Sequence, residues 1–360
     1  MIKSIYKNVK IILLVLLIIL STTLFNKDNV KLFAKGQNNS SCEVVMELQT
    51  GRILHASNEC KRAYMASTTK ILTSICVIEN TDINKLVKVN KDTVGIEGSS
   101  IYLEEGEILS IKDLLYGLML RSGNDCAETL AIETSGSIEE FAKLMNQTAI
   151  RIGATNSNFV NPHGLHDDNH YTTAYDLALI SCYALKNNVF REIVSTKSID
   201  IPWSTRNYCR HLINKNKMLS RLDGATGIKT GYTKKAGRCL VTSCKRNNME
   251  IVSVVLNCYD MWDRSEYLIN NAFNNYTQYK VIESDHIIDF IDVNNKKVGI
   301  YVKNDVLIPV IENEIKKIHL EICPNINNKS IKKDSEIGLA KIYIENNLIF
   351  EEKIYNIIDI

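Results

Sequence analysis

The sequence has almost no net charge and few aromatic residues. Its 43 Lys and Arg residues against 41 Asp and Glu residues leave a formal net charge of +2. No overall electrostatic field therefore favours nucleic acid or an acidic polymer. Aromatic residues make up 7% of the chain, most of them Tyr, and they do not alternate with Lys or Arg. Without an aromatic and basic stacking surface, we expect no nucleic-acid partner.

The sequence also has no Cys-x-x-Cys pair among its ten cysteines. An even number of cysteines in an exported chain usually indicates disulfides. Here, however, several lie inside apolar stretches, so we interpret most of them as small buried apolar residues. A reducing habitat would reconcile free thiols with export. The cysteines in apolar stretches are Cys76, Cys126, Cys182, Cys239 and Cys258.

The first 34 residues differ from the rest of the chain. Three lysines precede an unbroken apolar run over residues 11–20, which is the pattern of a secretory signal peptide. The run falls short of the ~20 residues that a membrane-spanning helix needs, and Ala34 offers a cleavage position. We therefore predict export, with a retained N-terminal membrane segment as the alternative.

Ser67 and Lys70 stand three residues apart at the expected start of a helix. Apolar residues follow with helical spacing, so both side chains should share one face, where the amine can reach the hydroxyl. Free N–H groups and a partial positive charge at the helix N-terminus complete a setting for a serine nucleophile with a lysine base. The motif alone is weak, because the same spacing occurs at Ser4 and Ser330.

A second motif, Ser122-Gly-Asn124, connects two expected helices at residues 111–120 and 126–134. Loops at such corners can direct side chains into a cleft, although the motif alone is also a plain turn. A third motif, Lys229-Thr230-Gly231, enters an expected edge strand. There it can present an ammonium and a hydroxyl, while the glycine leaves room for a ligand backbone. The simpler alternative for this third motif is a cationic hairpin turn.

The remaining pattern predicts an α/β region followed by a small all-β module that begins near residue 280. Short alternating strands and Asn/Lys-rich turns replace helical periodicity after residue 275. Expected elements are a hairpin at 44–55, helices at 141–152 and 175–185, and strands at 86–89, 238–243, 251–256, 298–302, 318–322, 339–344 and 348–350.

Together, the three motifs in this order resemble the serine-type D-alanyl-D-alanine carboxypeptidases, the low-molecular-mass penicillin-binding proteins of peptidase family S11. Ser-x-x-Lys, with Lys-Thr-Gly, also marks β-lactamases. The resemblance covers residues 40–270 and, more loosely, the β module. It implies a β-lactamase/transpeptidase-like domain (35–275) with a five-stranded antiparallel sheet and helices on both sides, then a small β-sandwich domain (280–360). Further matching segments are residues 48–54, 113–125, 141–146, 161–165 and 226–233.

The resemblance implies catalytic roles for four residues. Ser67 is the nucleophile and Lys70 its base, Ser122 relays a proton to the leaving D-alanine, and Asn124 orients Lys70 and the substrate. As a base, Lys70 needs a pKa far below the ordinary ~10.4, which desolvation and nearby positive charge can produce. Lys229 is the expected source of that charge.

The resemblance also implies the substrate contacts. Lys229, Thr230 and Gly231 line the peptide, the first two binding its terminal carboxylate. Arg264 is expected as a second carboxylate contact. The backbone N–H groups of Tyr232 and of the nucleophile form the oxyanion hole.

The implied function is removal of the terminal D-alanine from peptidoglycan stem pentapeptides through an acyl-enzyme. The expected partners are a stem peptide ending in D-Ala-D-Ala and, as inhibitors, β-lactam antibiotics. The site would lie at the outer face of the cytoplasmic membrane or in the cell wall. The amphipathic helix that often follows the β module is missing, so membrane association is left open. No cofactor or metal is expected, and we interpret His163, His166 and His170 as loop histidines.

Three alternatives remain open. A class A-type β-lactamase also needs a glutamate that activates the deacylating water, and no Glu-x-x-Leu-Asn occurs between Asn124 and Lys229. D,D-endopeptidase activity on cross-linked peptides is not separated from carboxypeptidase activity by the sequence. A catalytically idle muropeptide-binding protein is the non-enzymatic alternative.

Overall fold

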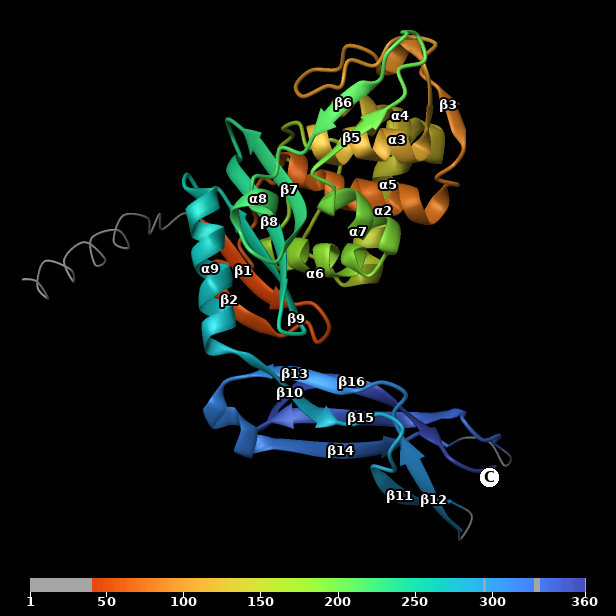
Figure 1. Ribbon diagram of the computed structural model, residues 1–360, viewed down its shortest axis with the longest axis vertical. Coiled ribbons are helices and arrows are strands. Elements are labelled where there is room, and N and C mark those ends of the chain that lie inside the picture. The colour runs from red at the N-terminus through yellow and green to blue at the C-terminus, as the bar shows by residue number, and fades with distance from the viewer. Residues whose placement is uncertain (1–40, 294–295, 327–330, 360) are drawn as a thin grey trace, which may run out of the picture. The chain divides into compact units, whose positions relative to one another are not determined.

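A five-stranded antiparallel sheet organises the region that carries the three motifs (Figure 1). The computed structural model describes residues 41–293, 296–326 and 331–359, so the predicted signal or membrane segment lies outside the described residues. The strand order is β2-β1-β9-β8-β7, and every neighbouring pair is antiparallel. The strands are β1 (Cys42–Glu47), β2 (Ile53–Ser57), β7 (Ala225–Thr233), β8 (Gly237–Arg246) and β9 (Met249–Leu256).

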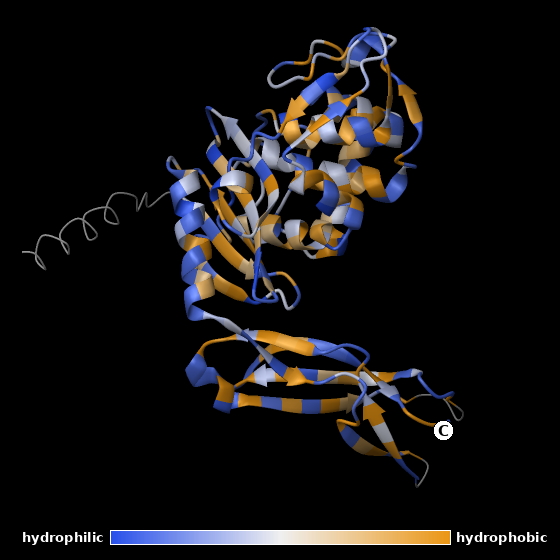
Figure 2. Ribbon diagram, in the orientation of Figure 1, coloured by the Kyte–Doolittle hydropathy of each residue, from blue (hydrophilic) through white to orange (hydrophobic). Residues whose placement is uncertain are grey.

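Helices cover both faces of this sheet, as the resemblance implied. Val44 of β1 packs into the larger core with the helices between β2 and β7. Its neighbour Val45 faces the opposite way, into a second core with Leu268 and Ile269 of α9 (Met261–Asn275). Because both faces are covered, all 8 residues of the central strand β9 are buried. Hydrophobic residues accordingly follow β1 and β9 (Figure 2).

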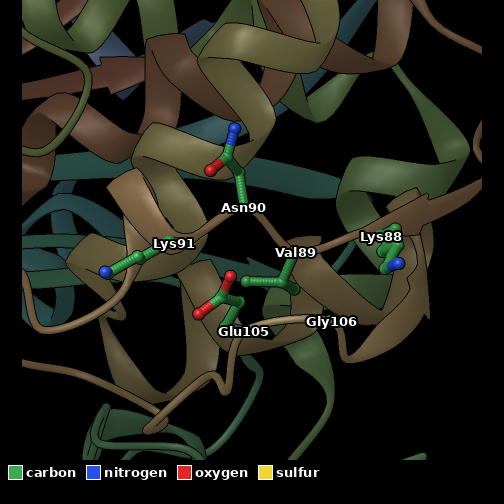
Figure 3. A pocket seen from close by; sticks show the side chains of 6 residues that line it. All are labelled: Lys88, Val89, Asn90, Lys91, Glu105 and Gly106. Atoms are coloured by element: carbon green, nitrogen blue, oxygen red, sulfur yellow. The ribbon is translucent and has the colours of Figure 1, made fainter.

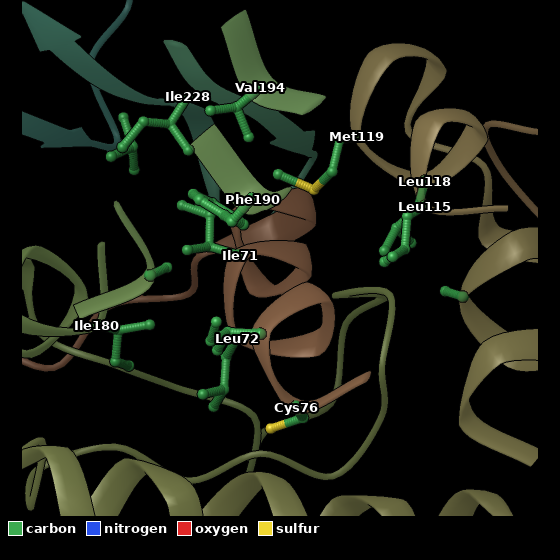
Figure 4. Packing of buried hydrophobic residues seen from close by; sticks show 14 of the residues in the cluster. Ile71, Leu72, Cys76, Leu115, Leu118, Met119, Ile180, Phe190, Val194 and Ile228 are labelled. Carbon is green, nitrogen blue, oxygen red and sulfur yellow. The ribbon is translucent and has the colours of Figure 1, made fainter. Parts of the chain in front are cut away.

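Helix α2 (Lys70–Asn80) runs through the middle of the larger core. Its first 8 residues are all buried, and Figure 4 shows Phe190 next to Ile71. A helix buried all round is fixed by packing on every side, so it is a rigid support for the motif at its N-terminus. The other helices on this face are α3 (Ile111–Tyr116), α4 (Asn124–Ser135), α5 (Ile138–Ile152), α6 (Ala174–Leu185) and α7 (Asn188–Ser195).

Most predicted elements are present, with shifted ends. The hairpin and the helices expected at 126–134, 141–152 and 175–185 are confirmed as β1–β2, α4, α5 and α6. The helix expected at 111–120 is divided into α3 and one π-helical turn, η3 (Gly117–Arg121). The sequence reading missed α7, α9 and the small hairpin of β5 (Ser198–Ile201) and β6 (Arg210–Ile213).

The C-terminal part is all-β, as predicted, and its two sheets share one apolar core. A two-stranded sheet packs against a five-stranded sheet of order β11-β12-β16-β15-β14, which gives a small sandwich. The exact domain boundary stays a prediction. The strands are β10 (Thr277–Ile282), β11 (Asp289–Val293), β12 (Lys296–Tyr301), β13 (Val306–Val310), β14 (Ile318–Pro324), β15 (Glu336–Ile344) and β16 (Asn347–Asn356).

All ten cysteines fall within the described residues as free thiols, and seven are buried. The five that the sequence placed in apolar stretches are among the buried ones. Burial raises the pKa of Cys76 and Cys239 to about 12, so both stay protonated and unreactive at neutral pH. Their expected role as small apolar residues is confirmed.

Candidate active site

Ser67 lies in a 3-10 turn, η1 (Ala66–Thr69), that leads directly into α2. It is half-buried, so its hydroxyl can be reached from outside. Ala66, just before it, has a left-handed φ of +48°, which is unfavourable for a residue with a β-carbon. Gly164 packs against this turn so closely that a β-carbon there would lie 1.9 Å from the Ala66 carbonyl oxygen. The loop around Gly164 therefore holds the turn that presents Ser67.

The Lys70 amine contacts three oxygen atoms. Its Nζ lies 2.7 Å from Asn124 Oδ1, 2.7 Å from the His163 carbonyl oxygen and 3.2 Å from Ser67 Oγ. The first two oxygens can only accept hydrogen bonds, whereas the hydroxyl can also donate. A neutral amine has two N–H groups and one lone pair. If the two N–H groups serve the carbonyl oxygens, the lone pair faces the Ser67 hydroxyl, which is the arrangement of a general base.

The charges around Lys70 favour this neutral form. Lys70 and Lys229 are 0% and 1% exposed. Burial, reinforced by the charge of Lys229, moves the pKa of Lys70 well below its ordinary value. Burial and the charge of Lys215 lower the pKa of Lys229 to about 7. Both expected causes of the Lys70 shift, desolvation and the Lys229 charge, are confirmed.

The second motif sits at a strained corner between η3 and α4. Ser122 is buried and left-handed, with a φ of +65°. Asn124 donates its backbone N–H to Ser99 O at 2.7 Å and its side-chain Nδ2 to Glu97 O at 2.6 Å. These two bonds fix the amide so that Oδ1 faces Lys70. Asn124 thus joins Lys70 and Ser67, as the sequence predicted, and Ser122 lies two residues before it at the same corner.

The third motif lies on β7, which is an edge strand, as expected. A β-carbon at Gly231 would lie 3.0 Å from Met65 O, 3.0 Å from Ser67 N and 3.1 Å from Thr68 N. The absence of a side chain therefore lets β7 approach the nucleophile's own N–H group. Lys229 Nζ donates to Thr230 O at 3.1 Å. Tyr232, the next residue, is 65% exposed, so this end of the edge strand is open to a ligand.

Residues 29–260 match the family model described as D-alanyl-D-alanine carboxypeptidase, peptidase S11. This chain belongs to that family. Residues 276–360 match a second model, the C-terminal domain of penicillin-binding protein 5. The first match includes all three motifs, so the family predicted from them is confirmed.

Curated members of the carboxypeptidase family resemble the chain over most of its length. The Bacillus subtilis D-alanyl-D-alanine carboxypeptidase DacF is 30% identical over 291 residues, 79% of this chain and 75% of that protein. DacA of Haemophilus influenzae is 30% identical over 319 residues, 82% and 78%. Penicillin-binding protein 5 of H. influenzae superposes with a TM-score of 0.73 at 26% identity, covering 88% of this chain and 96% of that one.

Arg264 is the expected carboxypeptidase-site residue that the structure does not bring to the cluster. It lies on α9 and forms an ion pair with Glu43 of β1, Nη2 to Oε2 at 2.7 Å. Glu43 shares the sheet face of its neighbour Val45, the α9 face, through strand alternation. Although burial opposes it, hydrogen bonds from His55 and Arg264 lower the pKa of Glu43 to about 2. A charged Glu43 therefore binds the guanidinium on the α9 face of the sheet.

Sequence reading missed Lys215 and His170. Lys215 sits in the loop after β6, donates to Ser99 Oγ at 3.0 Å, and lowers the pKa of both buried lysines. Nothing in its local sequence marks it, because the contact joins segments 116 positions apart.

His170 supports the turn that carries Ser67. Its Nδ1 accepts from Val160 N at 3.1 Å, so the neutral ring carries its proton on Nε2. Nε2 lies 2.8 Å from Thr69 Oγ1, which donates to Ala66 O at 2.8 Å. Burial lowers the pKa of His170 to about 3, which keeps this chain of bonds intact at neutral pH. Across the described parts of the chain, no three His, Cys, Asp or Glu side chains gather as a metal site.

A surface pocket elsewhere in the domain is separate from these residues. It lies where the end of β3 (Leu86–Lys88) approaches the turn before β4 (Ile108–Ser110) (Figure 3). No member of the three motifs lines it, so it is not part of the carboxypeptidase site. Its lining residues are Lys88, Val89, Asn90, Lys91, Glu105 and Gly106.

Proposed function

We propose that this protein is a serine D-alanyl-D-alanine carboxypeptidase that removes the terminal D-alanine from peptidoglycan stem pentapeptides. Family membership supports the reaction class. The observation that carries the assignment of residues is the Lys70 amine between two carbonyl oxygens and the Ser67 hydroxyl. A lysine with a depressed pKa in this position has a lone pair directed at its nucleophile.

Acylation begins when Lys70 Nζ takes the proton of Ser67 as Oγ bonds to the carbonyl carbon of the penultimate D-alanine. The oxygen of that carbonyl becomes negative and is stabilised by the N–H groups of Ser67 and Tyr232. The C–N bond then breaks. The proton held by Lys70 passes through the Ser122 hydroxyl to the leaving nitrogen, so free D-alanine departs and Lys70 is neutral again.

Deacylation reverses the proton path with water in place of D-alanine. Water attacks the ester carbon and its proton passes by way of Lys70 to Ser67 Oγ as the ester C–O bond breaks. During acylation Lys229 and Thr230 bind the terminal carboxylate, which leaves with D-alanine, and in both steps Asn124 holds the Lys70 amine in place. A β-lactam presents a strained amide to the same nucleophile, so penicillin is expected to acylate Ser67.

We further propose that the protein is exported and works at the outer face of the cytoplasmic membrane or in the cell wall. The basic and apolar pattern of the first 34 residues supports export, because the stem peptides of the wall lie outside that membrane. Within the described residues, every helix is too short or too polar to span a bilayer.

The test compares the chain without its first 35 residues with its Ser67→Ala variant. Each is incubated with a peptide ending in Lys-D-Ala-D-Ala, free D-alanine is measured, and fluorescent penicillin labelling runs in parallel. We expect release and labelling from the wild type and neither from the variant. A folded wild type that neither releases D-alanine nor binds penicillin would contradict the proposal, and persistent release by Ser67→Ala would contradict the nucleophile.

A further inference from the structure

Two segments about a hundred positions apart form one lobe beside the active site. They are residues 99–107, before β4, and residues 201–210, the β5–β6 connection, which lie side by side (Figure 1). A buried ion pair locks them: Arg210 contacts both oxygens of Glu107, at 2.7 and 3.0 Å. Arg210 also donates to Tyr102 O at 3.2 Å. We call residues 99–107 and 201–210 the aromatic lobe.

Exposed aromatic rings gather on this lobe. Tyr102 is 77% exposed and Tyr208 is 57% exposed. Trp203 lies beside Tyr208, with the Arg210 guanidinium carbon 3.9 Å from its ring and the ring of Tyr208 5.5 Å away, edge-on. Arg210 therefore contacts both the backbone of Tyr102 and the Trp203–Tyr208 pair. The Arg210 side chain is itself buried.

The backbone at Tyr102 is strained. Among the described residues, ten other than glycine have a positive φ, and six of those are Asn or Asp, which tolerate this conformation. Tyr102, at +60°, is the bulkiest of the remaining four. The buried Asp125 carboxylate holds it by accepting from Ile101 N and Leu103 N, both at 3.1 Å. A bulky ring held in this conformation and directed to solvent points to a ligand rather than to packing.

The lobe is connected to the catalytic groups through Asn124. The same asparagine that faces Lys70 Nζ at 2.7 Å donates its backbone N–H to Ser99 O at 2.7 Å. Tyr102 follows three residues after Ser99. A stem peptide of five residues spans at most about 17 Å. A peptide that reaches Ser67 therefore brings the sugar to which it is attached close to the rim of the site.

Charge on the lobe narrows the class of ligand. Glu107 is paired with Arg210, and Glu104 is paired with Arg206. These two pairs leave the exposed carboxylate of Glu105 as the remaining charge of the lobe. The lobe therefore has no excess of positive charge for phosphate or nucleic acid, and its exposed tyrosines are its main contact surface. Sugar rings have apolar C–H faces and hydroxyl edges, which suit tyrosine rings that carry their own hydroxyl.

We propose that the aromatic lobe binds the sugar rings of the glycan strand that carries the stem peptide. The inference rests on the proposed carboxypeptidase function, because that reaction brings a glycan-attached peptide to the cleft. The lobe makes the enzyme favour glycan-attached pentapeptides over the same peptide free in solution.

The test uses the double substitution Tyr102→Ala/Tyr208→Ala in the full chain. Release of D-alanine is compared on glycan strands bearing pentapeptides and on the free pentapeptide. We expect kcat/KM on the glycan-attached substrate to fall about tenfold, with the free peptide and penicillin acylation unchanged. Tyr102→Phe/Tyr208→Phe, which keeps both rings, should retain most of the preference. The matched control is Phe290→Ala, an aromatic residue 55% exposed on β11, which should change neither substrate.

A binding measurement separates this inference from the proposed function. Ser67→Ala protein is sedimented with insoluble glycan from which all peptides have been removed, with and without the two tyrosine substitutions. We expect the tyrosines to be required for sedimentation, whether or not the wild type releases D-alanine. Equal losses on both substrates, no loss on either, or sedimentation that survives both substitutions would overturn the lobe assignment. A wild type that is inactive on both substrates would overturn the carboxypeptidase proposal instead.

Discussion

Gly231→Ala tests the closeness of β7 to the nucleophile. The new methyl group would lie 3.0 Å from Met65 O and Ser67 N, so the edge strand must move away by a few tenths of an ångström. φ at Gly231 is not positive, which means that the substitution adds a steric contact without backbone strain. The movement separates the two N–H groups of the proposed oxyanion hole, at Ser67 and Tyr232. Since loss of one such donor costs about 10²–10³ in rate, we expect penicillin acylation to slow about 100-fold.

Stability should change far less than rate. Overpacking of this kind costs about 1–3 kcal/mol, which urea unfolding would measure beside stopped-flow acylation. Gly51→Ala is the contrasting control, because Gly51 has a φ of +70° and open space around it. That variant should lose about 1 kcal/mol of stability and acylate at the wild-type rate. Wild-type acylation by a folded Gly231→Ala protein would refute the close-approach argument.

Three further predictions concern charged groups. Lys229 has a pKa of about 7 and should lose its proton above that pH. Because the proposed carboxylate contact then loses its charge, kcat/KM for D-Ala-D-Ala peptides should fall. Lys215→Gln removes a charge that lowers the pKa of Lys229, so in a pH–rate profile it should move that fall to higher pH. His170 has a pKa of about 3 in the folded protein but near 6.5 in the unfolded chain. The unfolded chain therefore binds the proton first as the pH falls, and acid favours unfolding. Between pH 7 and 5 this costs about 2 kcal/mol, and urea unfolding of His170→Gln should lack that loss. Arg264→Gln should lower the free energy of unfolding by about 2 kcal/mol, because it leaves Glu43 short of a partner. The KM for D-Ala-D-Ala peptides should not rise. A raised KM at unchanged stability would instead support Arg264 as a carboxylate contact.

Local patterns predicted the elements that bury a continuous apolar stripe. The apolar run after Lys70 has a clear helical period, and β9 is a continuous run rich in β-branched residues, so α2 and this central strand could be placed. Helix α9 was missed because its sequence, rich in Asn and charged residues, buries a narrow stripe of Met261, Ser265, Leu268, Ile269 and Ala272. That stripe becomes a core only against the far face of the sheet.

The site residues differ in the same way: those in local motifs could be predicted, and those that depend on long-range contacts could not. Ser67, Lys70, Ser122, Asn124 and the Lys-Thr-Gly segment could be predicted because each belongs to a local motif. Lys215 and His170 were missed since their roles depend on contacts across 116 and 101 positions. Arg264 shows the converse case: a local likeness predicts it as a carboxylate contact, whereas its observed partner is Glu43, 221 positions away.

The conformation of the motifs was the least predictable feature. Ala66 and Ser122 both adopt left-handed backbone immediately before or within a catalytic motif, and neither residue type favours it. Such strain persists only where the surroundings enforce it. At Ala66 the enforcement comes from Gly164 and from the His170–Thr69 bond, and it directs Ser67 toward the lone pair of Lys70. The family motif therefore identifies the reacting groups, whereas their orientation depends on the loop that contains Gly164 and His170, about a hundred residues further along the chain.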